Sequence, residues 1–315
     1  MSEVVVEIEA PDIERFRRGN TGIPFATALE SGRPGPNVLI TALTHGNELS
    51  GAHALVRLFE TDVRPARGQL TLAFVNTDAY ARFDPANPRA TRYLDEDLNR
   101  VWSPDTLDGG RRSRELERAR QLRPLIEAAD YLLDLHSMQL PSPPLLLVGL
   151  HEKGRRLARR MGFPGTVVAD EGHRNGVRMR DHGRFGRADD PATAILVECG
   201  QHWARTSVDV AILTCRQFLQ ALDLVPAAAL DRLAPAPPPV EQRVVEVTEA
   251  VTVERGPFRF VDAYQGLEVV AEAGTVIAHD GDRPVTTPYD GCVLIMPSQR
   301  LATGLTAVRL GRQVA

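Results

Sequence analysis

Short apolar runs and longer amphipathic stretches alternate along most of the chain. The apolar runs are typical of buried strands and lie at residues 37–43, 69–75, 131–135, 145–150, 166–169 and 193–197. Apolar residues at helical spacing predict helices over residues 48–60, 111–129, 151–161 and 206–224. Because strands alternate with helices, we expect an α/β fold built on a mixed sheet that helices cover on both faces.

Two stretches interrupt this pattern in the first part of the chain. The turn-rich segment Ser-Gly-Arg-Pro-Gly-Pro at residues 31–36 separates residues 25–30 from residues 37–43, which predicts a β-hairpin. Residues 76–102 form a long polar stretch with two X-Pro steps. A loop of that length in a compact domain is usually functional or disordered.

The composition changes near residue 235. The segment Ala-Pro-Ala-Pro-Pro-Pro at residues 234–239 is typical of a stiff linker. Beyond it, short strands separated by Gly and Pro turns are predicted at residues 243–253, 267–270, 275–278, 293–296 and 307–310. We therefore expect two domains: residues 1–234, which carry the candidate chemistry, and a small all-β C-terminal domain of residues 235–315.

The composition limits the classes of function. The chain has 315 residues, of which 43% are hydrophobic and 25% charged, as in ordinary globular proteins. A net charge of −4 argues against nucleic acid or an anionic membrane as the main partner. The sequence has neither a signal-peptide apolar region at its start nor a run of about 20 apolar residues, so we expect a cytoplasmic protein. The 3 cysteines are too few and too scattered for a disulfide framework.

Two candidate metal ligands, His45 and Glu48, follow the first buried strand. If Glu48 lies in the first turn of the next helix, their spacing of three residues lets both side chains converge on one point. Gly46 between them allows a backbone geometry that most residues resist. On its own, His-x-x-Glu is a weak signal because it is common by chance.

A third candidate ligand, His136, follows the strand at residues 131–135. The carboxyl ends of parallel strands gather at one edge of a sheet, so His136 is expected near His45 and Glu48. Two histidines and one carboxylate match a hydrolytic zinc site, which keeps a fourth position open for water. Asp134 is placed to orient a ligand through a hydrogen bond. The alternative for His136 is an ordinary core histidine.

Two further segments carry candidate chemistry. Residues 92–100 read Arg-Tyr-Leu-Asp-Glu-Asp-Leu-Asn-Arg, and Asn99 beside Arg100 is suited to binding a carboxylate. The alternative is a charged, solvated loop. Glu198 ends the apolar strand at residues 193–197, where desolvation would raise its pKa toward the range useful for proton transfer. A structural, paired glutamate is the alternative there.

In four segments taken together, the chain resembles the succinylglutamate desuccinylase/aspartoacylase family, a branch of the zinc carboxypeptidase superfamily. The resemblance covers nearly the whole chain, including the β-rich C-terminal part. The matching segments agree in order and spacing: Thr-His-Gly-Asn-Glu at 44–48, Arg-Tyr-x-x-x-Asp-Leu-Asn-Arg at 92–100, Asp-Leu-His at 134–136 and Val-Glu-Cys-Gly at 197–200.

This resemblance implies a zinc carboxypeptidase-like fold and a role for each matching residue. It implies one zinc ion per chain, held by His45, Glu48 and His136. The other roles concern the substrate and the proton: Arg92 would polarise the scissile carbonyl, Asn99 and Arg100 would hold the carboxylate of the substrate amino acid, and Glu198 would be the general base and then the general acid.

The chain departs from the family in the segment before Glu198. Family members that act on dicarboxylic substrates carry a tyrosine and an arginine there, and this chain has arginines without the tyrosine. The sequence does not select which of them contacts the acyl group: Arg178, Arg180, Arg184 or Arg187.

The leading hypothesis is a zinc-dependent amidohydrolase, a deacylase that cleaves the amide bond of a small N-acyl amino acid or related compound. The alternative enzyme is a carboxypeptidase-like peptidase that acts on short peptides. A biotinyl or lipoyl carrier is rejected because residues 240–315 contain no lysine for attachment. We expect a small-molecule substrate, no nucleic acid and no membrane partner, and the sequence leaves a homo-oligomer open.

Overall fold

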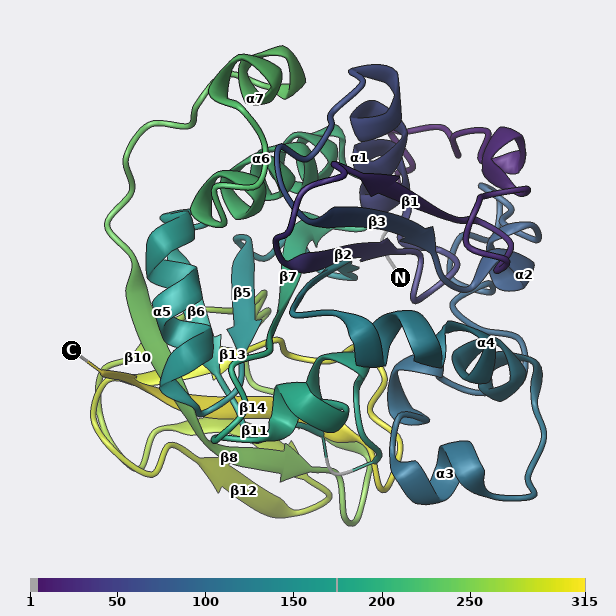
Figure 1. Cartoon of the computed structure of the whole chain (residues 1–315). Coiled ribbons are helices and arrows are strands. Elements are labelled where there is room, and N and C mark those ends of the chain that lie inside the picture. Colours follow the sequence, from purple (N-terminus) through teal and green to yellow (C-terminus); the bar gives the residue numbers. More distant parts are fainter. Residues whose placement is uncertain (1–4, 174, 315) are drawn as a thin grey trace.

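The computed structural model describes residues 5–173 and 175–314 (Figure 1). The helices are α1 (Leu49–Glu60), α2 (Thr77–Tyr80), α3 (Pro104–Asp108), α4 (Arg114–Ala128), α5 (Glu152–Met161), α6 (Arg205–Ala221) and α7 (Ala227–Leu233), and single-turn 3-10 helices are η1 (Glu14–Phe16), η2 (Leu98–Arg100), η3 (Met179–Asp181) and η4 (Gly183–Gly186). The strands are β1 (Ala26–Glu30), β2 (Asn37–Ala42), β3 (Gln69–Phe74), β4 (Tyr131–Met138), β5 (Leu145–Val148), β6 (Thr166–Ala169), β7 (Thr193–Gln201), β8 (Arg243–Thr252), β9 (Phe258–Phe260), β10 (Val269–Val270), β11 (Val276–Asp280), β12 (Arg283–Thr286), β13 (Cys292–Ile295) and β14 (Thr306–Val314).

One large mixed sheet organises the molecule. Its strand order is β1-β3-β2-β4-β7-β5-β6-β8-β14-β13-β10, and β12-β11-β9 form a second sheet. The central strands β3, β2, β4 and β7 are parallel, so their carboxyl ends lie at one edge. Strand β5 is antiparallel to β7, whereas β6 is parallel to both β5 and β8. The mixed α/β architecture agrees with the prediction from the sequence.

Alternate residues of the central strands enter two different apolar cores. On β2, Val38, Ile40 and Ala42 share a core with residues of α1, α5 and α6. Leu39, between them, packs in a second core with residues of α4. This period of two is the expected result of a strand with helices on either side of it. Figure 1 shows α1, α5 and α6 together on one side of the central strands.

The predicted hairpin between residues 25–30 and 37–43 is wrong. Strand β1 pairs with β3 in an antiparallel register, and β2 pairs with β3 and β4 instead. Parallel partners thus occupy both edges of β2, so β2 has no free backbone hydrogen-bonding edge with which β1 could pair. A turn signal shows where the chain reverses but not which strand it then meets. Helix α7 and the short strands β9 and β12 were not predicted.

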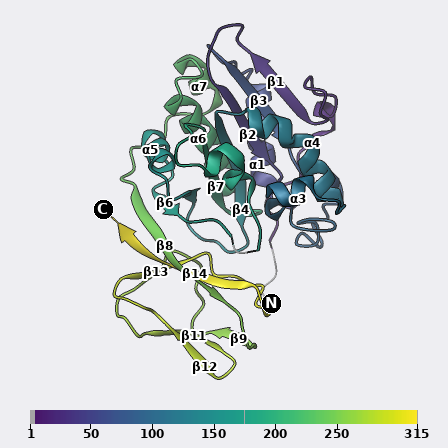
Figure 2. The same cartoon turned by 60° about the horizontal axis from the view of Figure 1, so that its bottom comes forward.

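The predicted all-β C-terminal region follows residues 234–242, which have no helix or strand. Its first strand, β8, continues the large sheet by pairing with β6, and β14 pairs with β8 (Figure 2). The region therefore shares a sheet with the preceding residues, and the boundary near residue 235 stays a prediction. Among the described residues, no helix has the length and hydropathy needed to span a membrane.

Candidate active site

The loop after β2 places the first two candidate ligands. Leu43 has a left-handed backbone (φ 61°), which turns the chain out of the strand before His45. Gly46 then passes so close to α2 that a Cβ atom would lie 2.5 Å from the Tyr80 amide nitrogen. Close packing, rather than an unusual φ, is what requires glycine here. Glu48 is the N-cap residue of α1 and lies just before its first turn, not within it.

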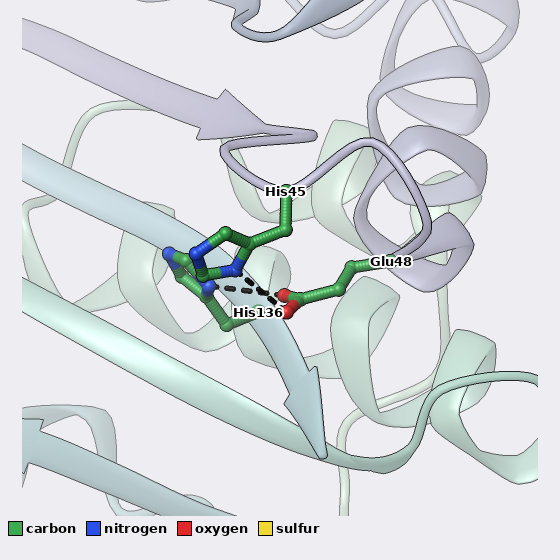
Figure 3. Close-up of side chains that lie close together, drawn as sticks. All are labelled: His45, Glu48 and His136. Carbon is green, nitrogen blue, oxygen red and sulfur yellow. Dashed lines mark hydrogen bonds and ion pairs between the residues drawn. The ribbon is translucent and has the colours of Figure 1, made fainter. Parts of the chain in front are cut away.

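The structure brings His45, Glu48 and His136 together (Figure 3). His45 Nδ1 lies 2.7 Å from Glu48 Oε1, and His136 Nδ1 lies 3.0 Å from Glu48 Oε2. All three side chains are buried, and one candidate ligand atom from each lies within 4.8 Å of the other two. His136 is part of β4, which runs to Met138 and so is longer than predicted. These three side chains offer two imidazole nitrogens and a carboxylate to a single point.

A carboxylate holds the far nitrogen of each histidine. His45 Nε2 lies 2.9 Å from Asp97 Oδ1, and His136 Nε2 lies 2.7 Å from Asp134 Oδ2. Asp134 is fully buried and also accepts hydrogen bonds from Thr41 and Thr44. A carboxylate that accepts the Nε2 hydrogen leaves Nδ1 free for a metal, an arrangement common around zinc-binding histidines.

The electrostatics of this group also suit a cation. Burial lowers the pKa of His136, but the charges of Asp134 and Glu48 outweigh burial and raise that pKa well above its usual value. Burial likewise raises the pKa of Glu48, and the two histidines reverse this and lower it well below its usual value. Three carboxylates, those of Glu48, Asp97 and Asp134, contact the two histidines, and one guanidinium, that of Arg92, also contacts His45. The donor set and its burial both fit a zinc ion.

A buried glutamate on α4 fixes the segment at residues 92–100. Glu115 Oε1 accepts a hydrogen bond from the Leu94 amide at 2.7 Å, and Oε2 accepts from the Asp95 amide at 3.0 Å and the Glu96 amide at 3.3 Å. Glu115 is fully buried. The solvated-loop alternative for this segment is therefore wrong.

This segment directs three candidate side chains at the cluster. Arg92 Nη2 donates to Asp97 Oδ2 at 3.0 Å. Asn99 Oδ1 accepts a hydrogen bond from the Met179 amide at 2.9 Å. The Asn99 Nδ2 group is therefore the one that is left to donate to other partners. Arg100 is only loosely paired, since its Nη2 lies 4.0 Å from Asp97 Oδ2. Arg92, Asn99 and Arg100 all line one cavity together with the three candidate ligands.

Glu198 lies in the same cavity, directly beside His136. The two residues are register partners on the parallel strands β4 and β7, so their side chains point to the same face. Glu198 is inside β7 rather than at its end, because Leu145 of β5 pairs with it from the other side. Its Oε2 is buried and has no hydrogen-bond partner among the described residues. Burial raises the pKa of Glu198 to about 8, although the charge of His136 acts in the opposite direction.

Of the four arginines left open by the sequence, Arg178 lines the cavity. Its guanidinium donates two hydrogen bonds to Asp170, at 3.1 Å and 2.8 Å. The other three are not among the residues that line the cavity. Arg180 shares Asp170 with Arg178 and also pairs with Asp181, Arg184 pairs with Asp130 and Asp190, and Arg187 pairs with Asp189.

Sequence reasoning missed three cavity residues. His202 is buried, and its Nδ1 lies 2.8 Å from Ser137 Oγ, the hydroxyl of the residue after His136. Arg309 reaches the cavity from β14. Asp97 lies within a recognised segment, but its contact with His45 has no sequence signal. The sequence gives no signal for His202 and Arg309 either, because their positions depend on how distant strands pair.

Comparison with known proteins agrees with the geometry. The family described as succinylglutamate desuccinylase/aspartoacylase catalytic domain matches residues 34–201, which include all four motifs. A protein named "Probable aspartoacylase" from Parasynechococcus marenigrum (strain WH8102) is 41% identical over 87 residues. That match spans 27% of this chain and 27% of the relative's length.

Solved structures share the fold over most of the chain. Succinylglutamate desuccinylase from Vibrio cholerae has a TM-score of 0.69 at 18% identity, and the match covers 93% of this chain and 86% of that one. An ectoine utilization protein from Ruegeria pomeroyi has a TM-score of 0.62 at 19% identity, with 91% and 88% covered. With the family match spanning more than half of its residues, the chain belongs to the succinylglutamate desuccinylase/aspartoacylase family.

Proposed function

We propose that this protein is a zinc-dependent deacylase that hydrolyses the amide bond of a small N-acyl amino acid. The observation that carries the proposal is the buried cluster of His45, Glu48 and His136, with the two Nδ1 atoms facing Glu48 and each Nε2 atom held by a carboxylate. Family membership supports an amide hydrolase of the deacylase type.

The residues around the cluster divide the chemistry between them. A zinc ion at this site would supply a Lewis acid that activates water and polarises the amide carbonyl. Glu198 would take a proton at its unpartnered Oε2 and return it to the leaving amine, for which a raised pKa is suitable. Arg92 would stabilise the developing negative charge on the carbonyl oxygen. Arg100, with its loose pairing to Asp97, would bind the substrate carboxylate together with Asn99.

The cavity has a volume of about 390 Å³, near the lower end of small-molecule sites. Residues from β14 and from the loop before it contribute to its lining, including Leu305, Thr306 and Arg309. This volume favours a small N-acyl amino acid over a peptide chain. We also propose a cytoplasmic location and a small-molecule substrate as the main partner.

Zinc analysis and a substrate panel test the proposal. The wild type is expected to hold about one zinc per chain and His45→Ala to lose it, because three ligands become two. His53→Ala is the matched control, since His53 lies on α1 and bonds the Glu9 carbonyl. Amine release from N-acyl amino acids but not from dipeptides is expected. Full zinc retention in His45→Ala contradicts the site, and activity on dipeptides alone favours a peptidase.

A further inference from the structure

The two residues that follow strand β7 contact both segments that position Glu48. His202 Nδ1 lies 2.8 Å from Ser137 Oγ, and the Ser137 amide donates a hydrogen bond of 3.0 Å to Glu48 Oε2. The next residue, Trp203, donates from its indole nitrogen to the Asn47 carbonyl at 3.1 Å. Glu48 is therefore supported at its carboxylate, through Ser137, and at the preceding residue of its own loop, through Trp203.

His202 has no role in the proposed chemistry, although it lines the cavity. Its side chain is 1% exposed, and its Nε2 has no hydrogen-bond partner among the described residues. Burial lowers the pKa of His202 to about 3, so the imidazole is neutral at physiological pH and balances no charge. An unpaired buried nitrogen costs free energy that an apolar side chain of the same size would avoid. Packing alone therefore does not account for a histidine at this position.

A bulge in β7 brings His202 to Ser137. The last two register pairs of β4 and β7 enclose one residue on β4 but two on β7: His136 with Glu198, and Met138 with Gln201. Gly200 lies inside this bulge with φ 108°, a conformation that favours glycine. Bulges redirect the side chains that follow them. Glu198 thus stays beside His136, whereas His202 reaches the residue next to it.

We propose that His202 is a positioning residue that holds Ser137 in place, so that the Ser137 amide fixes the Glu48 carboxylate. The inference rests on the zinc site of the proposed function. Glu48 Oε1 lies beside His45 and Oε2 beside His136 (Figure 3). A rotation of this carboxylate would change both distances at once. Groups that orient metal ligands typically contribute about 10- to 100-fold in metal affinity.

Two substitutions of His202 separate its hydrogen bond from its packing. Leucine has nearly the volume of histidine but no polar atom, whereas asparagine is smaller and places an amide near the position of Nδ1. Chelator competition is expected to show that His202→Leu binds zinc about 10- to 100-fold more weakly, and that His202→Asn stays within about threefold of the wild type. Ser137→Ala keeps the amide but removes Oγ, so it should resemble His202→Leu. Because the two residues act as a unit, the double variant should bind zinc no more weakly than either single variant.

Cobalt(II) substitution supplies a readout that is independent of activity. With cobalt at saturation, the visible absorption bands report the geometry of the ligands, so His202→Leu should shift them and His202→Asn should not. His182→Leu is the matched control, because His182 is also buried, bonds the Trp102 carbonyl through Nδ1 at 2.7 Å and is not among the cavity-lining residues. This control should leave zinc affinity and the cobalt bands unchanged, whatever its effect on stability.

The outcomes separate the inference from the proposed function. If the wild type binds zinc and His202→Leu binds it equally well, the inference is overturned and the zinc site stands. Equal losses in His202→Leu and His202→Asn also overturn it, because the hydrogen bond then has no effect of its own. A wild type that binds no zinc contradicts the proposed function and the inference together. If His202→Leu does not fold, Ser137→Ala decides: a loss of zinc affinity of at least about tenfold supports the inference, and unchanged affinity overturns it.

Discussion

Glu198 lacks the hydrogen-bond partner that most buried carboxylates have. Its Oε2 is unpartnered among the described residues, and its neighbour across the strands is His136. Such a group is poorly placed to stabilise the fold, because an unpaired buried polar atom costs free energy. It is well placed to accept a proton beside the proposed metal site, of which it is not a candidate ligand.

At the scale of this residue, Glu198→Gln is expected to lower kcat about 10²- to 10⁴-fold, the usual contribution of a general acid–base group. Zinc content and KM should change little, since the residue is neither a candidate ligand nor a carboxylate clamp. Glu246→Gln serves as a control because Glu246 is half-buried, lies outside the cavity lining and pairs with Arg155.

The pH dependence of the same variant is a second readout. Only ionised Glu198 accepts a proton, so activity should fall as the pH drops through its pKa. Burial raises that pKa, which moves the acidic limb above the range of an ordinary glutamate. Glu198→Gln should abolish the limb. Near-normal turnover would make Glu198 a bystander, and loss of zinc would make it a ligand.

At the scale of elements, one glutamate connects α4 to the segment at residues 92–100. Glu115 bonds three successive amides of that segment and the Asn76 side chain. The segment has no helix or strand before η2 to satisfy its backbone. The Glu115 carboxylate accepts the backbone hydrogen bonds that a helix or strand would otherwise provide, and so sets the position of Arg92 and Arg100.

Glu115→Ala should therefore unpair three partly buried backbone donors and the buried Asn76 side chain at once, and lower the free energy of unfolding by about 2–4 kcal/mol. KM for N-acyl amino acids should rise as well, because Asn99 and Arg100, the proposed carboxylate-binding residues, lose their support. Urea unfolding and steady-state kinetics measure the two effects. Glu117→Gln, on the same helix but with ion pairs only to the exposed Arg112 and the half-buried Arg120, should change stability by less than about 0.5 kcal/mol. Equal effects of the two changes would refute the special role of Glu115.

The sequence predicts an element well where neighbouring residues determine it, and poorly where residues far apart in the chain determine it. The apolar runs located β2, β4 and β7, and the family motifs then indicated His45, Glu48 and His136. The end of β7 was misplaced because Glu198 stays in the strand through register partners in both β4 and β5, and this pairing leaves no local signal. The hairpin failed for the same reason, since strand pairing is decided by distant residues. Arg309 could not be predicted because its place in the cavity follows from the pairing of β6 with β8.

At the scale of the whole molecule, an apolar core joins the two predicted domains. Leu145, Leu147, Val168 and Leu196 of the first part pack with Val245, Leu267, Val293 and Ile295 of the C-terminal part. Val168 and Val245 are also register partners on β6 and β8. The shared sheet and shared core predict that the two parts unfold together rather than as independent units.

Val245→Ala tests this coupling from the C-terminal side. Val245 is fully buried, so its truncation should lower the free energy of unfolding by about 1.5–3 kcal/mol. Both tryptophans, Trp102 and Trp203, lie in the first part, so their fluorescence reports on that part alone. If unfolding is cooperative, the tryptophan transition should shift to lower urea together with the far-ultraviolet circular dichroism transition. Val269→Ala, at a residue that is 54% exposed on β10, should shift neither. A tryptophan transition that stays in place while the circular dichroism splits into two steps would instead establish residues 235–315 as an independent folding unit.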